Sequence, residues 1–266
     1  MAEEIGSDMR KQVAIGCRIV GLDLNPGGGH VSARVPGTDE MLMRCRGGGA
    51  EGGMRNTDLH HIRRVDFDGE GPGLGKRHFA PAETPIHGEI YRARPDVGAV
   101  LHSHPHYSML CSIAGLDLRP IFAAYNTGAT GLAIAGVPLY SRGETVIDKD
   151  MAAEMIEAML DRDVLLLKGH GVVTVGSTVQ EAVGHAFALE DLARVTWEIA
   201  TIGKQLPDIS GADYARYDRR DPNRRVPPPN RGGHALPPEE RGVMASYVAK
   251  LKQTIGLPSW ELDEEG

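Results

Sequence analysis

Two histidines in the stretch "VLHSHPHY" have the spacing of paired metal ligands. His102 and His104 follow an apolar run and flank a single serine. Because side chains at i and i+2 of a β-strand point to the same face, both imidazoles converge at the end of a strand over residues 97–104. A third imidazole, His170, lies between two glycines in "LLLKGHGVV", after another apolar strand. We therefore expect a divalent-metal site made by His102, His104 and His170.

A carboxylate is available to complete this site. Glu83 lies in a turn before a helix that is predicted to begin near Thr84 and Pro85, to end before Pro95 and to lead into the histidine strand. In a chain with 11 histidines, one closely spaced pair is more often a surface or structural feature. The same pair together with a Gly-His-Gly sequence at a second strand turn is a much more specific signal.

The elements that must position these side chains follow an α/β pattern. Apolar residues at helical spacing predict helices over 1–22, 148–162 and 178–203, the last with Ser177 or Thr178 as its N-cap and Glu181 completing a capping box. Strands are predicted within 30–35, 41–46, 62–71, 97–104 and 164–176. Strands that alternate with helices in this way indicate an α/β fold.

Composition bounds the organisation and the class of partner. We expect a catalytic domain over 1–206 and, over 207–266, an extended Pro/Arg-rich tail with a short C-terminal helix that either packs on a neighbouring subunit or stays mobile. The chain has 36 acidic and 29 basic residues, which does not favour nucleic acid, and it has no apolar stretch of about 20 residues that would span a membrane. It shows no signal peptide, no paired cysteines and no GxGxxG motif, so we expect a cytoplasmic protein without disulfides or an organic cofactor.

The histidine motifs resemble those of the class II aldolase/adducin family. The likeness covers about residues 10–205 and rests on "PAETPIHGEIYRARPDVGAVLHSHPHYS" and "LLLKGHGVVTVG". It implies a three-layer α/β/α fold around a mainly antiparallel, mixed sheet. It also implies that His102, His104 and His170 hold Zn, Mn, Fe or Co, and that Glu83 ligates the metal or acts as a base. The resemblance further implies a homotetramer with sites at subunit boundaries, where Tyr125 occupies the region of a tyrosine acid contributed across the boundary.

Departures from the sugar-phosphate aldolases indicate a different substrate. Pro81 and Ala82 precede Glu83 where those enzymes have serines, so a cradle for a phosphate is missing. The stretch "GGGHVSARVPG" resembles a "GHxSxR" sequence of the branch that contains decarboxylases of hydroxylated aromatic acids. We expect four residues to bind a carboxylated substrate, although each arginine among them could equally be a surface charge: His30, Ser32, Arg34 and Arg46.

Retro-aldol cleavage and decarboxylation are both aided by a divalent metal. Each reaction leaves an electron pair, which the metal stabilises on a neighbouring oxygen. We therefore expect a metal-dependent carbon–carbon lyase. The favoured reaction is decarboxylation of a hydroxylated aromatic dicarboxylate such as 3,4-dihydroxyphthalate, with Glu83 as the first proton shuttle and Tyr125 as a second. The alternatives are an aldolase or epimerase acting on a small hydroxy-carbonyl compound, and a non-catalytic adducin-like module, a class that lacks the three histidines.

Overall fold

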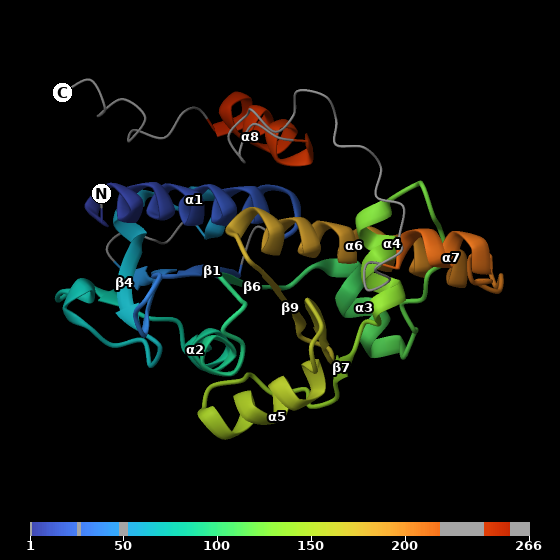
Figure 1. The fold of residues 1–266 in the computed structure, drawn as a ribbon, viewed down its shortest axis with the longest axis horizontal. Helices are drawn as coiled ribbons and strands as arrows, with labels where there is room; N and C mark the ends of the chain where they lie inside the picture. Colours follow the sequence, from blue (N-terminus) through green and yellow to red (C-terminus); the bar gives the residue numbers. More distant parts are fainter. Residues whose placement is uncertain (1, 26–27, 48–52, 219–241, 256–266) are drawn as a thin grey trace.

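A seven-stranded sheet forms the middle layer of the protein. The computed structural model describes residues 2–25, 28–47, 53–218 and 242–255 (Figure 1). The strands lie in the order β4-β2-β1-β6-β9-β8-β7, and neighbours are antiparallel except for the parallel pair of β7 and β8. Their bounds are β1 (Gly29–Arg34), β2 (Glu40–Arg44), β4 (Ile62–Asp66), β6 (Ala99–Ser103), β7 (Leu139–Tyr140), β8 (Val164–Leu167) and β9 (Gly171–Gly176). The expected mixed, mainly antiparallel sheet is confirmed.

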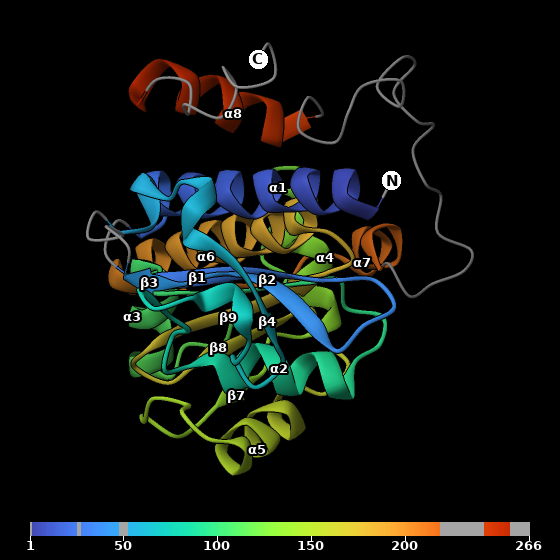
Figure 2. The same cartoon turned by 90° about the vertical axis from the view of Figure 1, so that its left-hand side faces the viewer.

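Helices cover both faces of this sheet. One face carries α1 (Ala2–Asp23), α3 (His106–Ala114), α4 (Thr127–Ala135) and α6 (Val179–Thr201), and the other carries α2 (Thr84–Ala93) and α5 (Lys149–Met159). Figure 2 shows α1 and α6 above the sheet and α2 and α5 below it. Alternate residues of one strand serve the two layers, since Val100 packs in the α2/α5 cluster and Leu101 in the α1/α6 cluster. The predicted three-layer α/β/α fold is confirmed.

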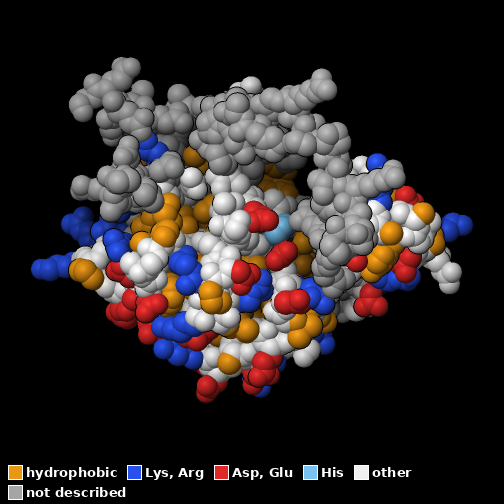
Figure 3. Space-filling model, in the orientation of Figure 1, with side chains coloured by type: hydrophobic (Ala, Val, Ile, Leu, Met, Phe, Trp, Pro, Cys, Tyr) orange, Lys and Arg blue, Asp and Glu red, His pale blue; other side chains and the backbone are white. Residues whose placement is uncertain are grey.

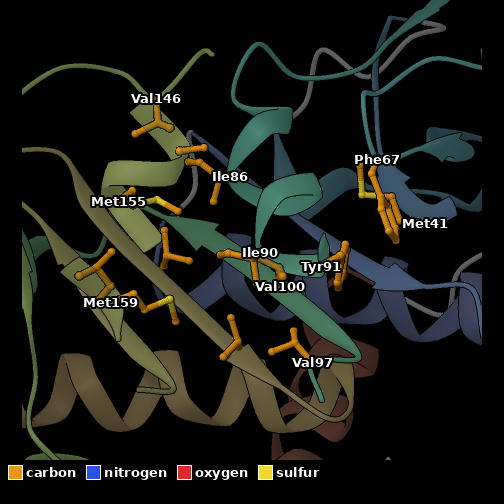
Figure 4. Close-up of a cluster of buried hydrophobic side chains, with 14 of the residues drawn as sticks. Met41, Phe67, Ile86, Ile90, Tyr91, Val97, Val100, Val146, Met155 and Met159 are labelled. Carbon is orange, nitrogen blue, oxygen red and sulfur yellow. The ribbon is translucent and has the colours of Figure 1, made fainter. Parts of the chain in front are cut away.

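The helix α2 carries residues of the site and is fixed closely against the sheet. Pro85 lies in its first turn, as predicted, and Ile86 and Ile90 are buried one turn apart. Figure 4 shows Ile86, Ile90 and Tyr91 in the same apolar cluster as Val100. A Cβ atom at Gly88 would lie 1.8 Å from the carbonyl oxygen of Phe67, so only glycine allows this close approach.

The start of α6 has the predicted N-cap, and Glu181 reaches back to the residue before it. The Thr178 hydroxyl accepts a hydrogen bond from the backbone N–H of Glu181 at 3.2 Å, and Glu181 Oε2 accepts one from the backbone N–H of Ser177 at 2.8 Å. Thr178 is therefore the N-cap, and Ser177 is the residue before it. The carboxylate of Glu181 also accepts a hydrogen bond from the Ser177 hydroxyl. These bonds fix the turn between β9 and α6.

Several elements lie outside the sequence predictions. Helices α3 and α4 are short, and apolar spacing in the sequence does not predict them. Two strands, β3 (Arg46–Gly47) and β5 (His78–Phe79), form a separate small sheet, and single turns of 3₁₀ helix occur at Met54–Asn56, Leu59–His61 and Pro72–Leu74.

The described residues after α6 form two helices. The sequence predicts extended chain from residue 207. The structure instead has the helix α7 (Gly211–Tyr217). Its N-cap is Ser210, whose hydroxyl accepts a hydrogen bond from the backbone N–H of Asp213. The expected C-terminal helix is α8 (Gly242–Ile255), which packs through Tyr247 and Val248 on the α1/α6 cluster. The Pro/Arg-rich stretch over 219–241 and Trp260 lie outside the described residues.

Two features bear on membranes and polyanions as partners: the net charge of the chain and the hydropathy of the described helices. The formal net charge is −7 at pH 7. Acidic and basic side chains intermingle on the face seen in Figure 3. A search of the described helices finds none that is both long and apolar enough to cross a membrane.

Candidate metal centre

One carboxylate and three imidazoles converge beside the end of β6. Glu83, His102, His104 and His170 each place one potential ligand atom so that all four atoms lie within 4.8 Å of one another. The three histidines come from the two predicted motifs, and Glu83 comes from the N-cap position of α2. The structure thus brings together all four predicted ligands.

Hydrogen bonding aims the ring of His102 at this cluster. His102 is the fourth residue of β6 and is fully buried. Its Nδ1 lies 2.9 Å from the carbonyl oxygen of Val172, which can only accept, so the Nδ1–H donates and the Nε2 lone pair faces the cluster. That Nε2 lies 2.9 Å from Nε2 of His104. Two imidazole nitrogens this close together could both bind one divalent metal ion.

The glycines around His170 have distinct backbone roles. Gly169 has a φ of +67°, a left-handed conformation that glycine adopts readily. Gly171 begins β9 against the end of β6, where an added Cβ would lie 2.3 Å from the carbonyl oxygen of Ser103 and 2.9 Å from the His104 ring. The Gly-His-Gly sequence therefore lets His170 turn back toward the strand that carries the other two histidines.

Substituting Gly171 by alanine should displace His104 and weaken metal binding. We expect the dissociation constant for a divalent metal to rise by about tenfold or more, as for other changes that disturb ligand orientation. Gly184→Ala is the matched control, because its Cβ would meet no atom within 4 Å. Metal titration of both purified variants checks this, and equal affinities would contradict the assigned role of Gly171.

Glu83 supplies an ionised and largely buried carboxylate. Its side chain is 12% exposed; Oε2 lies 3.4 Å from Nε2 of His102 and 3.6 Å from Nε2 of His30, and Oε1 lies 3.5 Å from Nε2 of His170. Burial by itself would raise the pKa of Glu83, but the contacts with His102 and His30 outweigh it and hold the pKa well below its usual range.

The donor set fits a divalent cation. Oε1 of Glu83 is buried and has no hydrogen-bond partner among the described residues. Burial, helped by the neighbouring His102 and His170, lowers the pKa of His104 to about 4, and burial also lowers the pKa of His170. Neutral imidazoles and an ionised carboxylate are the protonation states that bind metals. Three nitrogens and one oxygen suit Zn, Mn, Fe or Co.

The predicted trio on β1 shares one strand face, as its alternation requires, but only His30 reaches the cluster. Helix α2 covers this face. His30 Nδ1 lies 2.7 Å from Nε2 of His87, and the Ser32 hydroxyl lies 2.7 Å from both Nδ1 of His87 and the Tyr91 hydroxyl. His87 and Tyr91 were not predicted as site residues. Their signal was present, because Glu83, His87 and Tyr91 are spaced at i, i+4 and i+8 along one helix face.

Arg34 is turned away from the cluster, which corrects the expectation that it faces a bound anion. Its guanidinium donates to the carbonyl oxygens of Val97 at 3.0 Å, Arg94 at 3.1 Å and Tyr91. It also lies over the aromatic rings of Phe67 and Tyr91. These carbonyls belong to the last turn of α2 and the loop beyond it, so Arg34 closes the C-terminal end of the helix that begins at the metal centre.

Substituting Arg34 by alanine should therefore lower stability rather than substrate affinity. Charged hydrogen bonds are worth ~1.5–3 kcal/mol each and do not add fully, so we expect a loss of about 3 kcal/mol in the free energy of unfolding. Arg34→Lys should recover part of it, because lysine keeps the charge without the planar fork. Denaturant unfolding measures the loss. A raised KM with unchanged stability would instead place Arg34 at the substrate.

The remaining two predicted residues are exposed. Arg46 lies on β3, and its charge helps to lower the pKa of His30, mainly a burial effect, to about 4. Tyr125 is 64% exposed and lies outside the cluster; its hydroxyl accepts a hydrogen bond from Arg194 at 2.9 Å. Arg194 lies on α6 and lines a groove of about 840 Å³ between the helices of that layer. None of the four cluster residues lines this groove.

Comparison with known proteins agrees with the fold and the motifs. A model of the class II aldolase and adducin N-terminal domain matches residues 13–197. Similar curated proteins include 3,4-dihydroxyphthalate decarboxylases of Arthrobacter keyseri (39% identical over 211 residues) and Rhodococcus jostii (41% over 189 residues). These alignments cover 77% and 70% of this chain and 84% and 77% of the respective relatives.

A solved structure supports the same fold. The L-fuculose 1-phosphate aldolase from Glaciozyma antarctica has a TM-score of 0.71 at 21% identity, with 96% of this chain and 93% of that chain covered. At this identity the likeness concerns the fold alone. On the extent of the family match and the identity to its relatives, the chain belongs to the class II aldolase and adducin family.

Proposed function

We propose that this protein is a metal-dependent lyase that decarboxylates a hydroxylated aromatic dicarboxylate of the 3,4-dihydroxyphthalate class. The observation that carries the proposal is the convergence of Glu83 with His102, His104 and His170. Relatives that are 39% and 41% identical bear the name of this activity. The three histidines also argue against the adducin-like alternative, because a non-catalytic module does not need a metal site.

A divalent metal bound at the four residues would act as a Lewis acid for the electron pair left on the ring when the carbon–carbon bond breaks. His102, His104 and His170 would hold it, with Zn, Mn, Fe and Co as the candidates. The donor set needs no organic cofactor to supply this chemistry.

Glu83 is the residue we assign to proton transfer. Its carboxylate is ionised and Oε1 is unpartnered among the described residues, so Oε1 can accept the proton of a substrate hydroxyl. The bond between the ring and the carboxylate then breaks, carbon dioxide leaves, and the ring carbon takes up a proton from Glu83. We assign Arg46, an exposed cation on the His30 side of the cluster, to pairing with a substrate carboxylate.

Tyr125 would take part from a neighbouring subunit, because it is exposed and is not one of the residues that converge in the cluster of its own chain. This assignment depends on a homotetramer, which stays a prediction, as do the cytoplasmic location and the division into a catalytic unit over 1–206 and a tail over 207–266. Light scattering of the purified protein measures the oligomer.

The test is release of carbon dioxide from 3,4-dihydroxyphthalate by protein loaded separately with each candidate metal. We expect one carbon dioxide and one dihydroxybenzoate per substrate consumed. Phthalate is the matched control substrate: it carries the carboxylates without hydroxyls and should not react. Cleavage of a hydroxy-carbonyl compound without any carbon dioxide from the dihydroxyphthalate would favour the aldolase alternative.

A further inference from the structure

A buried chain of hydrogen bonds runs from Tyr91 on α2 to His30 on β1 and ends beside Glu83. The Tyr91 hydroxyl lies 2.7 Å from the Ser32 hydroxyl, which lies 2.7 Å from Nδ1 of His87. Nε2 of His87 lies 2.7 Å from Nδ1 of His30, and Nε2 of His30 lies 3.6 Å from Oε2 of Glu83. Tyr91, Ser32, His87 and His30 are each at most 3% exposed.

The three bonds of 2.7 Å are compatible with two opposite directions, and the atom beyond His30 favours one of them. Nε2 of His30 has no hydrogen-bond partner among the described residues and lies 3.6 Å from Oε2 of Glu83, and a carboxylate oxygen at this position favours a proton on Nε2 over a lone pair. Nδ1 of a neutral His30 is then an acceptor, which requires Nε2–H on His87. Nδ1 of His87 accepts in turn from the Ser32 hydroxyl, and Ser32 accepts from the Tyr91 hydroxyl. In this set of tautomers all donors point toward Glu83.

Burial favours the neutral forms of the two α2 side chains in this chain. Burial is the main cause that lowers the pKa of His87 well below its usual value. Burial likewise raises the pKa of Tyr91, so its hydroxyl keeps the proton that it donates.

The two carboxylate oxygens of Glu83 have different surroundings. Oε2 faces His30 and His102, whereas Oε1 faces His170 and has no hydrogen-bond partner within the described part of the chain. A proton donor fixed on Oε2 restrains rotation of the carboxylate and leaves Oε1 as the oxygen open to the reaction.

We propose that Tyr91, Ser32 and His87 are positioning residues that hold His30 as an Nε2–H donor to Oε2 of Glu83, so that Oε1 is presented to metal and substrate. The proposal deepens the proposed function, since it concerns the same carboxylate. It assigns a role to Ser32 that differs from substrate contact, and it adds two residues of α2 to the machinery of the site.

The first test reads the tautomers directly. Nitrogen-15 NMR of histidine-labelled, metal-loaded protein should show Nε2–H, neutral forms of both His30 and His87, assigned by their loss in His30→Gln and His87→Gln. An Nδ1–H form of either ring would overturn the direction of the chain. This readout does not require a substrate, so it stands even where no carbon dioxide is released.

The second test measures coupling along the chain. Ser32→Ala should raise the dissociation constant for Co²⁺ by about tenfold, the lower end of effects seen when the partners of ligands are removed, and lower kcat with little change in KM. Tyr91→Phe should act in the same direction by a few fold. In the double variant, Tyr91→Phe should add nothing, because without the Ser32 hydroxyl the tyrosine has no path to His87.

Tyr140→Phe is the matched control. Tyr140 lies in the same apolar cluster as Tyr91 and is 4% exposed. Its hydroxyl, however, lies 3.4 Å from the Glu154 carboxylate and 3.5 Å from the Met151 carbonyl oxygen. We expect its Co²⁺ affinity to equal that of the unmodified protein. Additive effects of Ser32→Ala and Tyr91→Phe, or a Co²⁺ affinity unchanged in Ser32→Ala, would overturn the proposal. Intact metal and tautomer results with no decarboxylation would overturn the proposed reaction alone.

Discussion

Substituting His102 by alanine should abolish stoichiometric metal binding and all activity that depends on the metal. His102 is the fully buried member of the cluster, and its Nε2 lies within 3.4 Å of both His104 and Glu83. Disturbing a group that only orients a ligand costs ~10–100-fold in affinity, so loss of the ligand itself should cost more than about 100-fold. Elemental analysis after dialysis gives the metal content directly.

Thermal unfolding gives a second readout of the same loss. A ligand present at 100 times its dissociation constant stabilises a protein by about 2.7 kcal/mol, so added metal should raise the Tm of the unmodified protein and not of the variant. His104→Ala, at a half-buried position just beyond β6, provides a variant with less risk to the fold. His60→Ala is the control, since its side chain is 51% exposed and outside the cluster. Stoichiometric metal in both cluster variants would rule out this site.

The second large effect is expected from Glu83→Gln. Glutamine keeps the shape of the side chain but cannot be ionised, so it cannot accept and return a proton at Oε1. General acid–base groups contribute ~10²–10⁴-fold, and we expect kcat to fall by about this factor. Metal content should stay close to that of the unmodified protein, because three imidazoles remain.

Glu89→Gln on the same helix is the matched control. Glu89 pairs with Arg92 on the outer side of α2, away from the four cluster residues, and its loss should leave kcat unchanged. Steady-state kinetics and elemental analysis of both variants separate the two roles of Glu83. Loss of the metal in Glu83→Gln would make the carboxylate mainly a ligand, and an unchanged kcat would exclude it from proton transfer.

The convergence of the candidate metal ligands could be predicted from the sequence because it depends on short spacings. His102 and His104 are two residues apart at a strand end, and the glycines beside His170 allow a tight return to the neighbouring strand. Pro85 and the capping residues of α6 likewise affect only residues within a few positions along the chain. Local geometry of this kind does not depend on how distant segments of the chain pack.

The roles of His30, Ser32 and Arg34 could not be predicted, because they depend on what covers β1. Their alternation predicts one shared face, and that face is real. Only the packing of α2, brought close by Gly88 against Phe67, turns Ser32 into a partner of His87 and Arg34 into a cap for the helix end.

The sequence by itself determined the fold class, the four residues of the candidate metal centre and the family. The tertiary structure decided which strands are neighbours, which face of α2 is buried and which polar side chains meet there. The physical reason is range: periodicity, capping and turn geometry act over a few residues. The hydrogen-bonded chain from Tyr91 to His30, by contrast, joins segments more than 50 residues apart that meet only when α2 and the sheet close on each other.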